Sequence, residues 1–130
     1  MSDGHTQTVR TIETLLLVAI GGFAGSNLRY FVGALLAGAA GTLVVNVLGS
    51  FALGFLLYEA HYSAVVSHRT HVVVGTGFLS SFTTYSTFAL ESVGFGFAGL
   101  GYVAASYALG FGAVLIGRRL AIVVDGGEWR

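Results

Sequence analysis

The feature that most constrains this chain is the spacing of its charged residues. No Asp, Glu, Lys or Arg lies between Glu13 and Arg29, and the stretches 30–58, 70–90 and 92–117 are also free of charge. A helix needs about 20 mostly apolar residues to cross the hydrocarbon core of a bilayer. The pattern therefore predicts four membrane-spanning helices, at about 13–35, 41–58, 70–92 and 98–118.

Composition points the same way. Hydrophobic residues make up 55% of the chain, charged residues only 9%, and the mean hydropathy is +0.81. Soluble domains average about 25% charged residues, and small domains bury the smallest fraction of their surface. We therefore expect an all-α integral membrane protein, one domain over residues 1–130, crossing the cell membrane several times with the lipid bilayer as its solvent.

The same composition excludes several classes of function. The formal net charge is zero and there is no Lys, which is unlike a nucleic-acid binder. There is no Cys, which excludes a thiol nucleophile and a disulfide framework. The apolar stretches hold no carboxylate pair, phosphate loop or nucleophile with a base in reach, so we do not expect an enzyme. The four His residues show no metal-ligand spacing, and we expect them to be solvated.

The arginines predict the orientation of the spans. With four crossings, both termini and the 59–69 loop lie on one side of the membrane. That side carries five of the six arginines, and only Arg29 lies on the other. The positive-inside rule then places both termini in the cytoplasm. The segment before Leu15 lacks the basic start of a signal peptide, and we expect the polar ends, 1–10 and 125–130, to fray.

Polar side chains at membrane depth are informative because an unsatisfied polar group costs several kcal/mol in lipid. Asn46 shares a helix face with Thr42, Gly49 and Ser50. Two interpretations remain open. The Asn46 amide bridges two helices while the glycines allow close packing, or it lines a polar path. Polar residues in the last span either pack against a neighbour or continue such a path, namely Tyr102, Ser106 and Gly110.

The strongest local signal is a run of hydroxyls in the third span. Seven of the eight residues from Ser80 to Thr87 carry one. Ser and Thr side chains compete with the helix for backbone hydrogen bonds, so the run predicts a break in the helix near 80–84. Broken helices at membrane depth occur where freed carbonyls meet an ion, water or another chain. The run is therefore a candidate site.

Aromatic rings accompany the hydroxyls. Tyr85 and Phe88 are three residues apart and face one side of the helix, with Glu91 a turn later. The edge of an aromatic ring is positive, so ring edges along a narrow path can coordinate a small anion. Arg29 and Glu91 lie near the same membrane surface, where they either pair or reach headgroup water.

Together these segments resemble the Fluc fluoride-channel family, also called CrcB, over nearly the whole chain. The similarity lies in GGFAGSNLRY at 21–30, GTLVVNVLGSF at 41–51 and FTTYSTF at 82–88, with Tyr102, Ser106 and Gly110 in the last span. The second and third motifs, at this spacing in a chain of four spans, are specific to the family.

The resemblance implies an antiparallel, dual-topology dimer with two pores that passively export fluoride from the cytoplasm. It also implies a structural sodium ion, not transported, at the dimer interface. Main-chain carbonyls of the broken third helix would hold this ion, at the positions of Ser80 and Thr83. The pore-lining residues that it implies are Asn46, Tyr85, Ser86, Thr87, Phe88, Tyr102 and Ser106.

The chain departs from the family pattern in three ways. Ser80-Ser81 replaces Gly-Gly, and Tyr85 replaces a Phe. The five-to-one arginine bias also differs from the near-equal orientations that an antiparallel homodimer needs. We therefore expect a subunit of fixed orientation that pairs with an oppositely oriented relative, and the homodimer stays open as an alternative.

Two other functions compete with the channel. A small multidrug-type, proton-coupled transporter also has four spans, but it needs a carboxylate in mid-membrane. Glu13 and Glu91 lie at the ends of the predicted helices instead. A non-conducting structural subunit would use Asn46 and the hydroxyl run only for packing. For such a subunit Phe88→Ile would change stability alone, whereas a channel would lose throughput.

Overall fold

The computed structural model describes residues 2–63 and 65–126, and this part of the chain contains helices and short connections but no strand. Three of its helices are long and apolar enough to cross a membrane, over Asp3–Leu35, Ala39–Tyr62 and Ala98–Val124. The elements are α1 (Ser2–Leu35), α2 (Ala39–Tyr58), η1 (Glu59–Ser63), α3 (His68–His71), η2 (Val72–Leu79), α4 (Ser80–Phe82), α5 (Ser86–Gly94) and α6 (Ala98–Val124), where η denotes a π-helix.

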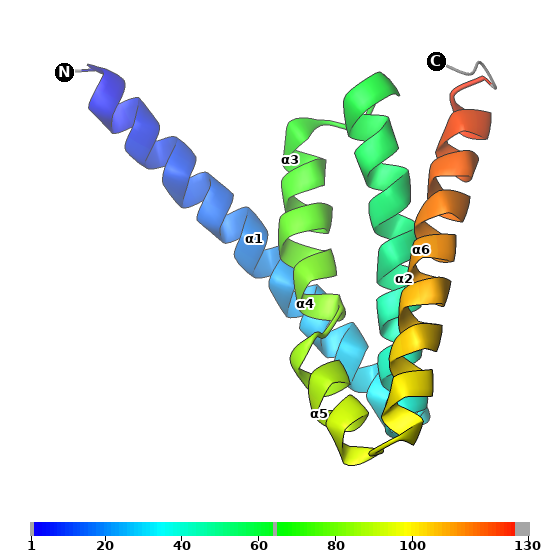
Figure 1. The fold of residues 1–130 in the computed structure, drawn as a ribbon. Coiled ribbons are helices and arrows are strands. Elements are labelled where there is room, and N and C mark those ends of the chain that lie inside the picture. Colours follow the sequence, from blue (N-terminus) through cyan, green and yellow to red (C-terminus); the bar gives the residue numbers. More distant parts are fainter. Residues whose placement is uncertain (1, 64, 127–130) are drawn as a thin grey trace.

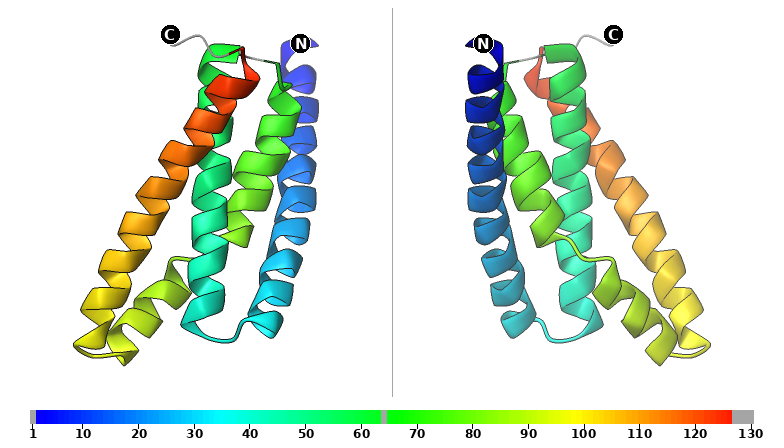
Figure 2. Two further views of the ribbon diagram at one scale, coloured as in Figure 1. Left: turned by 90° about the vertical axis from the view of Figure 1, so that its right-hand side faces the viewer. Right: turned by 90° about the vertical axis from the view of Figure 1, so that its left-hand side faces the viewer.

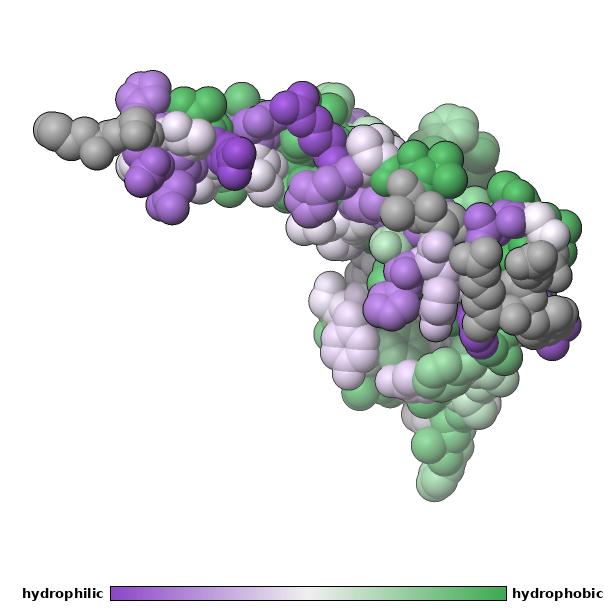
Figure 3. All heavy atoms as spheres, turned by 90° about the horizontal axis from the view of Figure 1, so that it is seen from above, coloured by the Kyte–Doolittle hydropathy of each residue, from purple (hydrophilic) through white to green (hydrophobic). Residues whose placement is uncertain are grey.

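The helices form an elongated bundle (Figure 1). The described ends of the chain and the connection after η1 lie at one end of this bundle, and the connections at 36–38 and 95–97 lie at the other (Figure 2). This is the arrangement expected of the four predicted crossings. Seen from the end that holds the chain termini, hydrophilic residues gather along the first turns of α1, and hydrophobic residues cover much of the rest (Figure 3).

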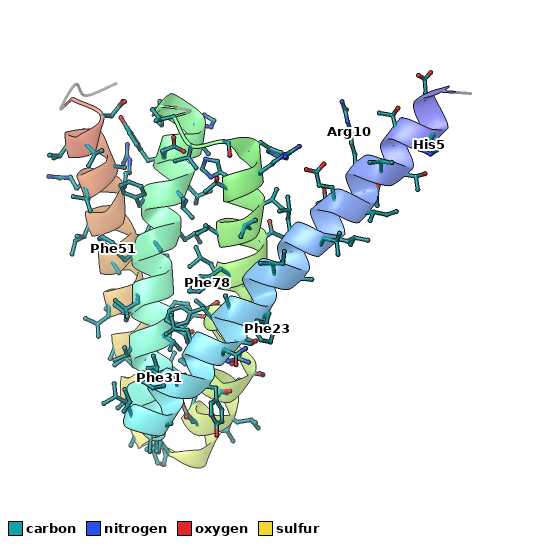
Figure 4. The ribbon with its side chains drawn as sticks, turned by 180° about the vertical axis from the view of Figure 1, so that it is seen from behind. His5, Arg10, Phe23, Phe31, Phe51 and Phe78 are labelled. Atoms are coloured by element: carbon teal, nitrogen blue, oxygen red, sulfur yellow. The ribbon has the colours of Figure 1, made fainter. Side chains whose placement is uncertain are left out.

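Helix α1 begins earlier than the sequence predicted. Its first described residue is Ser2, so the polar segment that we expected to fray is helical. The 34 residues span about 51 Å at 1.5 Å per residue, which exceeds the roughly 30 Å of a bilayer core. The first half of α1, with His5 and Arg10, leans away from the other helices (Figure 4). A tilt of this kind is how a long helix fits a bilayer.

Glycines let the longer helices approach closely. A Cβ at Gly54 of α2 would collide with the Val114 carbonyl, and one at Gly117 of α6 with the Phe51 carbonyl. On the other side of the bundle, a Cβ at Gly21 of α1 would collide with the Val73 carbonyl in η2. Small residues at crossings are typical of helices that pack in lipid, where dispersion rather than hydrophobic burial holds them together. These contacts fix α6 on α2 and η2 on α1.

The third predicted span is built from short pieces. Helix α4 ends at Phe82, α5 begins at Ser86, and Thr83 between them is extended, with φ −81° and ψ 159°. Before α4 the chain is π-helical over eight residues rather than α-helical. This segment therefore differs from a continuous helix over 70–92 both in its winding and at residues 83–85.

Candidate functional site

The non-helical residues 83–85 are held by a side chain from α2. The Asn46 Nδ2 donates to the Thr84 carbonyl at 2.9 Å, and the Thr84 N–H donates to Asn46 Oδ1 at 2.8 Å. In a continuous α-helix that N–H would reach the carbonyl of Ser80. The Asn46 amide thus replaces backbone partners that the end of α4 removes, and one of its two N–H groups remains for another acceptor.

Further contacts define the geometry at the same point. The Thr84 hydroxyl accepts the Thr87 N–H at 3.3 Å and donates to the Thr87 hydroxyl at 3.1 Å, in the manner of a helix cap for α5. From α1, the Arg29 Nη1 donates to the Thr83 carbonyl at 3.3 Å. The Thr83 hydroxyl donates back to the Leu79 carbonyl at 2.9 Å. Contacts from α1, α2, η2 and α5 therefore position the residues between α4 and α5.

A groove of about 530 Å³ opens beside residues 83–85. Its walls come from α2, from η2 and α4, and from α5 and α6, so it collects side chains that are far apart in the sequence. The residues that line it are Asn46, Gly49, Ser50, Leu53, Gly75, Leu79, Ser80, Thr83, Thr84, Tyr85, Phe88, Ser106, Tyr107, Gly110, Phe111 and Val114. We call this cavity the groove. Apolar walls with a few polar groups are typical of a binding site for a small ligand.

One polar group in the groove is buried and has no partner. The Ser106 hydroxyl oxygen is shielded, and no hydrogen-bond partner for it lies among the residues that the structure describes. Buried hydroxyls are normally paired. Tyr58 Oη is in the same condition but belongs to the apolar cluster of Tyr58, Ala121 and Ile122, away from the groove. Ser106 therefore offers an unused donor at the wall of the groove.

Phe88 is the centre of a cluster of aromatic rings. Its side chain is only 9% exposed. Its ring centroid lies 6.0 Å from that of Tyr85, 5.4 Å from that of Tyr102 and 6.2 Å from that of Tyr107. The first neighbour shares the α4–α5 segment, and the other two come from α6. The cluster thus holds the Phe88 ring at the wall of the groove.

Two hydroxyl groups of other helices donate to the Glu91 carboxylate. Its carboxylate accepts the Thr42 hydroxyl at 3.1 Å and the Tyr102 hydroxyl at 2.9 Å. Arg29, which we expected either to pair with Glu91 or to reach headgroup water, contacts the Thr83 carbonyl instead. Among the described residues, Arg29 and Glu91 form no ion pair with each other. Both line a second cavity of about 510 Å³, to which Thr42, Thr84 and Thr87 also contribute.

The predicted pore and metal residues are divided among these places. The groove collects Asn46, Ser80, Thr83, Tyr85, Phe88 and Ser106. Thr87 lines the second cavity. Ser86 is exposed and lines neither of these two cavities. Tyr102 also lines neither, and its hydroxyl donates to Glu91.

Sequence reasoning did not single out several residues of the groove, among them Thr84 and Tyr107. Thr84 belongs to the hydroxyl run but was not singled out, and its backbone is the partner of Asn46. Tyr107 follows Ser106 directly and precedes Phe111 by four residues, so an aromatic pair at helical spacing was the available signal. That spacing does not reveal which face of α6 meets Phe88.

The chain offers oxygen ligands of the kind that sodium takes. Thr83 is extended, and the α-helical donor for the Ser80 carbonyl is bound to Asn46 instead, so both main-chain carbonyls lie where the helical pattern ends. Carbonyl oxygens suit an alkali cation, and the donor type therefore fits the ion that the resemblance implies. The Arg29 guanidinium already occupies one side of the Thr83 carbonyl, at 3.3 Å.

A second polar cluster lies at the end of the bundle that holds the termini. The Glu59 carboxylate accepts the Val66 N–H at 2.6 Å and lies 2.6 Å from His71 Nε2. Our expectation that every His is solvated is wrong for His71, because this partly buried side chain pairs with Glu59. Arg69 and Glu13 also pair there, at 2.8 Å, but Arg69 is exposed and Glu13 is only partly buried, and such a pair contributes little.

Known proteins match this chain over most of its length. The family described as CrcB-like protein, Camphor Resistance, matches residues 16–118. Fluoride-specific ion channel FluC 1 of Haloarcula marismortui is 52% identical over 127 residues, covering 98% of each chain. FluC 2 of Halobacterium salinarum is 49% identical, over 85% of this chain and 88% of the relative. FluC of Oceanobacillus iheyensis is 39% identical, over 85% of this chain and 93% of the relative. The chain belongs to the CrcB family.

Proposed function

We propose that this chain is a subunit of a passive, fluoride-selective channel in the cell membrane. The observation that carries the proposal is the groove, which brings Asn46, Phe88 and Ser106 from three separate parts of the sequence to one cavity. The relatives are named fluoride-specific ion channels, at up to 52% identity over nearly the whole chain. A groove with donors suited to a small anion is what such a function requires.

The chemistry of the groove suits an anion that holds its water tightly. Fluoride accepts hydrogen bonds, and to leave water it needs replacement donors. The groove offers the remaining Asn46 N–H, the unpaired Ser106 hydroxyl and the aromatic ring of Phe88. The Tyr85 hydroxyl adds another donor at its exposed side. Among the residues that the structure describes, no carboxylate lines the groove, so none of them sets a fixed negative charge against an anion there.

The proposal extends to the assembly. Two subunits pack antiparallel, with the segment from α3 to α5 as a third crossing that is interrupted at residues 83–85. The Ser80 and Thr83 carbonyls would hold a structural sodium ion, which would supply positive charge. Fluoride leaves the cytoplasm down its gradient. The partner is either a second copy or a related subunit of opposite orientation, and the arginine bias favours the related subunit.

Fluoride efflux from liposomes tests the proposal. The purified chain is reconstituted into vesicles loaded with potassium fluoride, and a fluoride electrode follows the outside solution. Valinomycin lets potassium leave and so drives the anion outward. We expect efflux to begin when valinomycin is added, and to be absent from vesicles without protein. Vesicles loaded with potassium chloride measure selectivity, and we expect little efflux from them.

The control arms separate the competing functions. A passive channel conducts fluoride without a pH gradient, whereas efflux that requires one indicates a proton-coupled transporter. If the chain alone is silent, reconstitution with a family member of opposite arginine bias tests the paired subunit. Silence in both arms contradicts the channel and leaves the multidrug-type transporter and the structural role. Reporter fusions at the C-terminus test orientation, because equal amounts of both orientations contradict a fixed one.

A further inference from the structure

Tyr107 of α6 is a residue of the groove that neither the sequence pattern nor the family motifs single out. Its ring stands nearly perpendicular to that of Phe88, at 83°, with the centroids 6.2 Å apart. The Tyr107 ring also lies near that of Phe111, with the centroids 6.1 Å apart. All three residues line the groove. Tyr107 thus pairs both with the buried ring of Phe88 and with the next aromatic residue on α6.

The three neighbours of Phe88 constrain it differently. Tyr102 is fixed by its hydrogen bond to Glu91 at 2.9 Å. Tyr85 belongs to the same segment as Phe88 and is largely exposed, so it moves with that segment. Tyr107 comes from a separate helix, and it is the neighbour of Phe88 that meets it edge to face and also lines the groove. A perpendicular pair sets the positive edge of one ring against the negative face of the other.

We propose that Tyr107 is a positioning residue that fixes the orientation of the Phe88 ring in the groove and thereby sets how well the path discriminates between anions. The functional half of this inference rests on the proposed fluoride channel. An aromatic ring presents a positive edge or a negative face to the groove, depending on how it is turned. A fixed ring therefore offers an anion the same surface at all times, and a rotating ring does not.

Two variants of Tyr107 separate the ring from its hydroxyl. Tyr107→Leu removes the aromatic partner of Phe88 but keeps an apolar side chain on α6. Tyr107→Phe keeps the ring and removes only the hydroxyl. The matched control is Leu109→Ala, because Leu109 lies on the same helix, is 50% exposed against 53% for Tyr107, and lines neither of the two cavities described.

The first measurement reports on the ring itself and needs no transport. A 3-fluorophenylalanine placed at position 88 gives two ¹⁹F signals when the ring is held and one averaged signal when it rotates quickly. We expect two signals in the otherwise unchanged chain, in Tyr107→Phe and in Leu109→Ala, and one signal in Tyr107→Leu. Identical spectra in all four proteins would overturn the positioning role.

The second measurement is the ratio of fluoride to chloride efflux from liposomes. We expect Tyr107→Leu to lower this ratio roughly 2- to 10-fold, the range that loss of one aromatic pair supports. We expect Tyr107→Phe and Leu109→Ala to have the same ratio as the unsubstituted protein. A uniform fall in both fluxes at a constant ratio would show a structural role only and contradict the inference.

The two readouts distinguish this inference from the proposed function. If the unsubstituted protein conducts no fluoride in either reconstitution, the channel proposal fails, and with it the discrimination half of the inference. The ¹⁹F spectra still decide whether Tyr107 holds Phe88. If the protein conducts and the spectra or the ratio ignore Tyr107, the inference fails while the channel stands.

Discussion

Two polar regions of the molecule satisfy their buried groups in different ways. At the end that holds the termini, both carboxylate oxygens of Glu59 have partners, the Val66 N–H and His71. At the groove, Asn46 uses one of its two N–H groups, and the Ser106 hydroxyl has no hydrogen-bond partner among the described residues. We call the first region the closed region, because its carboxylate is fully paired within the protein, and it holds a connection between helices. We call the second the open region, because it leaves donors unused, which is what a surface that receives an anion needs.

The largest expected effect comes from Asn46, which belongs to both kinds of region because it holds Thr84 and also lines the groove. Asn46→Leu leaves the Thr84 N–H and carbonyl unpaired, at a cost of about 1–3 kcal/mol for each buried group. We expect unfolding stability in detergent to fall by about 2–5 kcal/mol and fluoride efflux to be lost.

The control for this change is Asn27→Leu on α1, where the exposed side chain bonds only to the Phe23 carbonyl of its own helix. That variant should unfold like the unsubstituted protein. Asn46→Asp keeps an acceptor for the Thr84 N–H and loses the donor to its carbonyl, so its stability should fall between the two. Equal stability of Asn46→Leu and Asn27→Leu would contradict the bridging role.

Glu59→Gln tests the closed region. The change removes the charge that faces His71 while the amide oxygen still reaches the Val66 N–H. We expect a lower midpoint of thermal unfolding and an unchanged ratio of fluoride to chloride efflux. A changed ratio would break the comparison, because it would show that this end of the bundle also acts on the anion.

Ser106→Ala tests the open region with the opposite expectation. Its hydroxyl has no partner among the described residues, so removing it should leave stability within about 0.5 kcal/mol. Fluoride efflux should fall several-fold, because the path loses a donor. The measurement pairs thermal unfolding with the liposome assay. A large loss of stability would place Ser106 with the closed region instead.

The smallest effect is expected for Tyr85→Phe. Its ring is largely exposed and remains near Phe88 after the change, so only the hydroxyl at the open side of the groove is lost. We expect unchanged stability and a change in fluoride efflux of about two-fold or less, in line with a hydrogen bond that water partly replaces. A complete loss of efflux would sharpen the comparison by making this hydroxyl a required donor.

The sequence predicted the long apolar helices well, because a charge-free stretch of this length has few alternatives to crossing a membrane. It also directed attention to the hydroxyl run, within which α4 ends and α5 begins. The predicted start of the first helix, at about residue 13, was wrong, because α1 is already helical at Ser2. Three hydroxyls in this segment donate to carbonyls four residues earlier, so the helix satisfies these polar side chains itself. They belong to Thr8, Thr11 and Thr14.

Other features were beyond the reach of a sequence pattern. The turns of η2 are wider than those of an α-helix, so helical spacing does not give the faces of residues 72–79. The partners of Glu91 come from α2 and α6, 49 and 11 residues away. Which of several polar groups pair across such separations depends on how the helices cross, and spacing along one helix does not contain that information.

Thr84 borders both cavities, and this has a thermodynamic consequence. Because Thr84 lines both cavities, a displacement of Thr84 alters the space available in each of them. Occupancy of the two compartments is then linked, and linkage is reciprocal. A groove ligand that weakens binding in the second cavity by displacing Thr84 is itself bound more weakly, by the same factor, when that second cavity is filled.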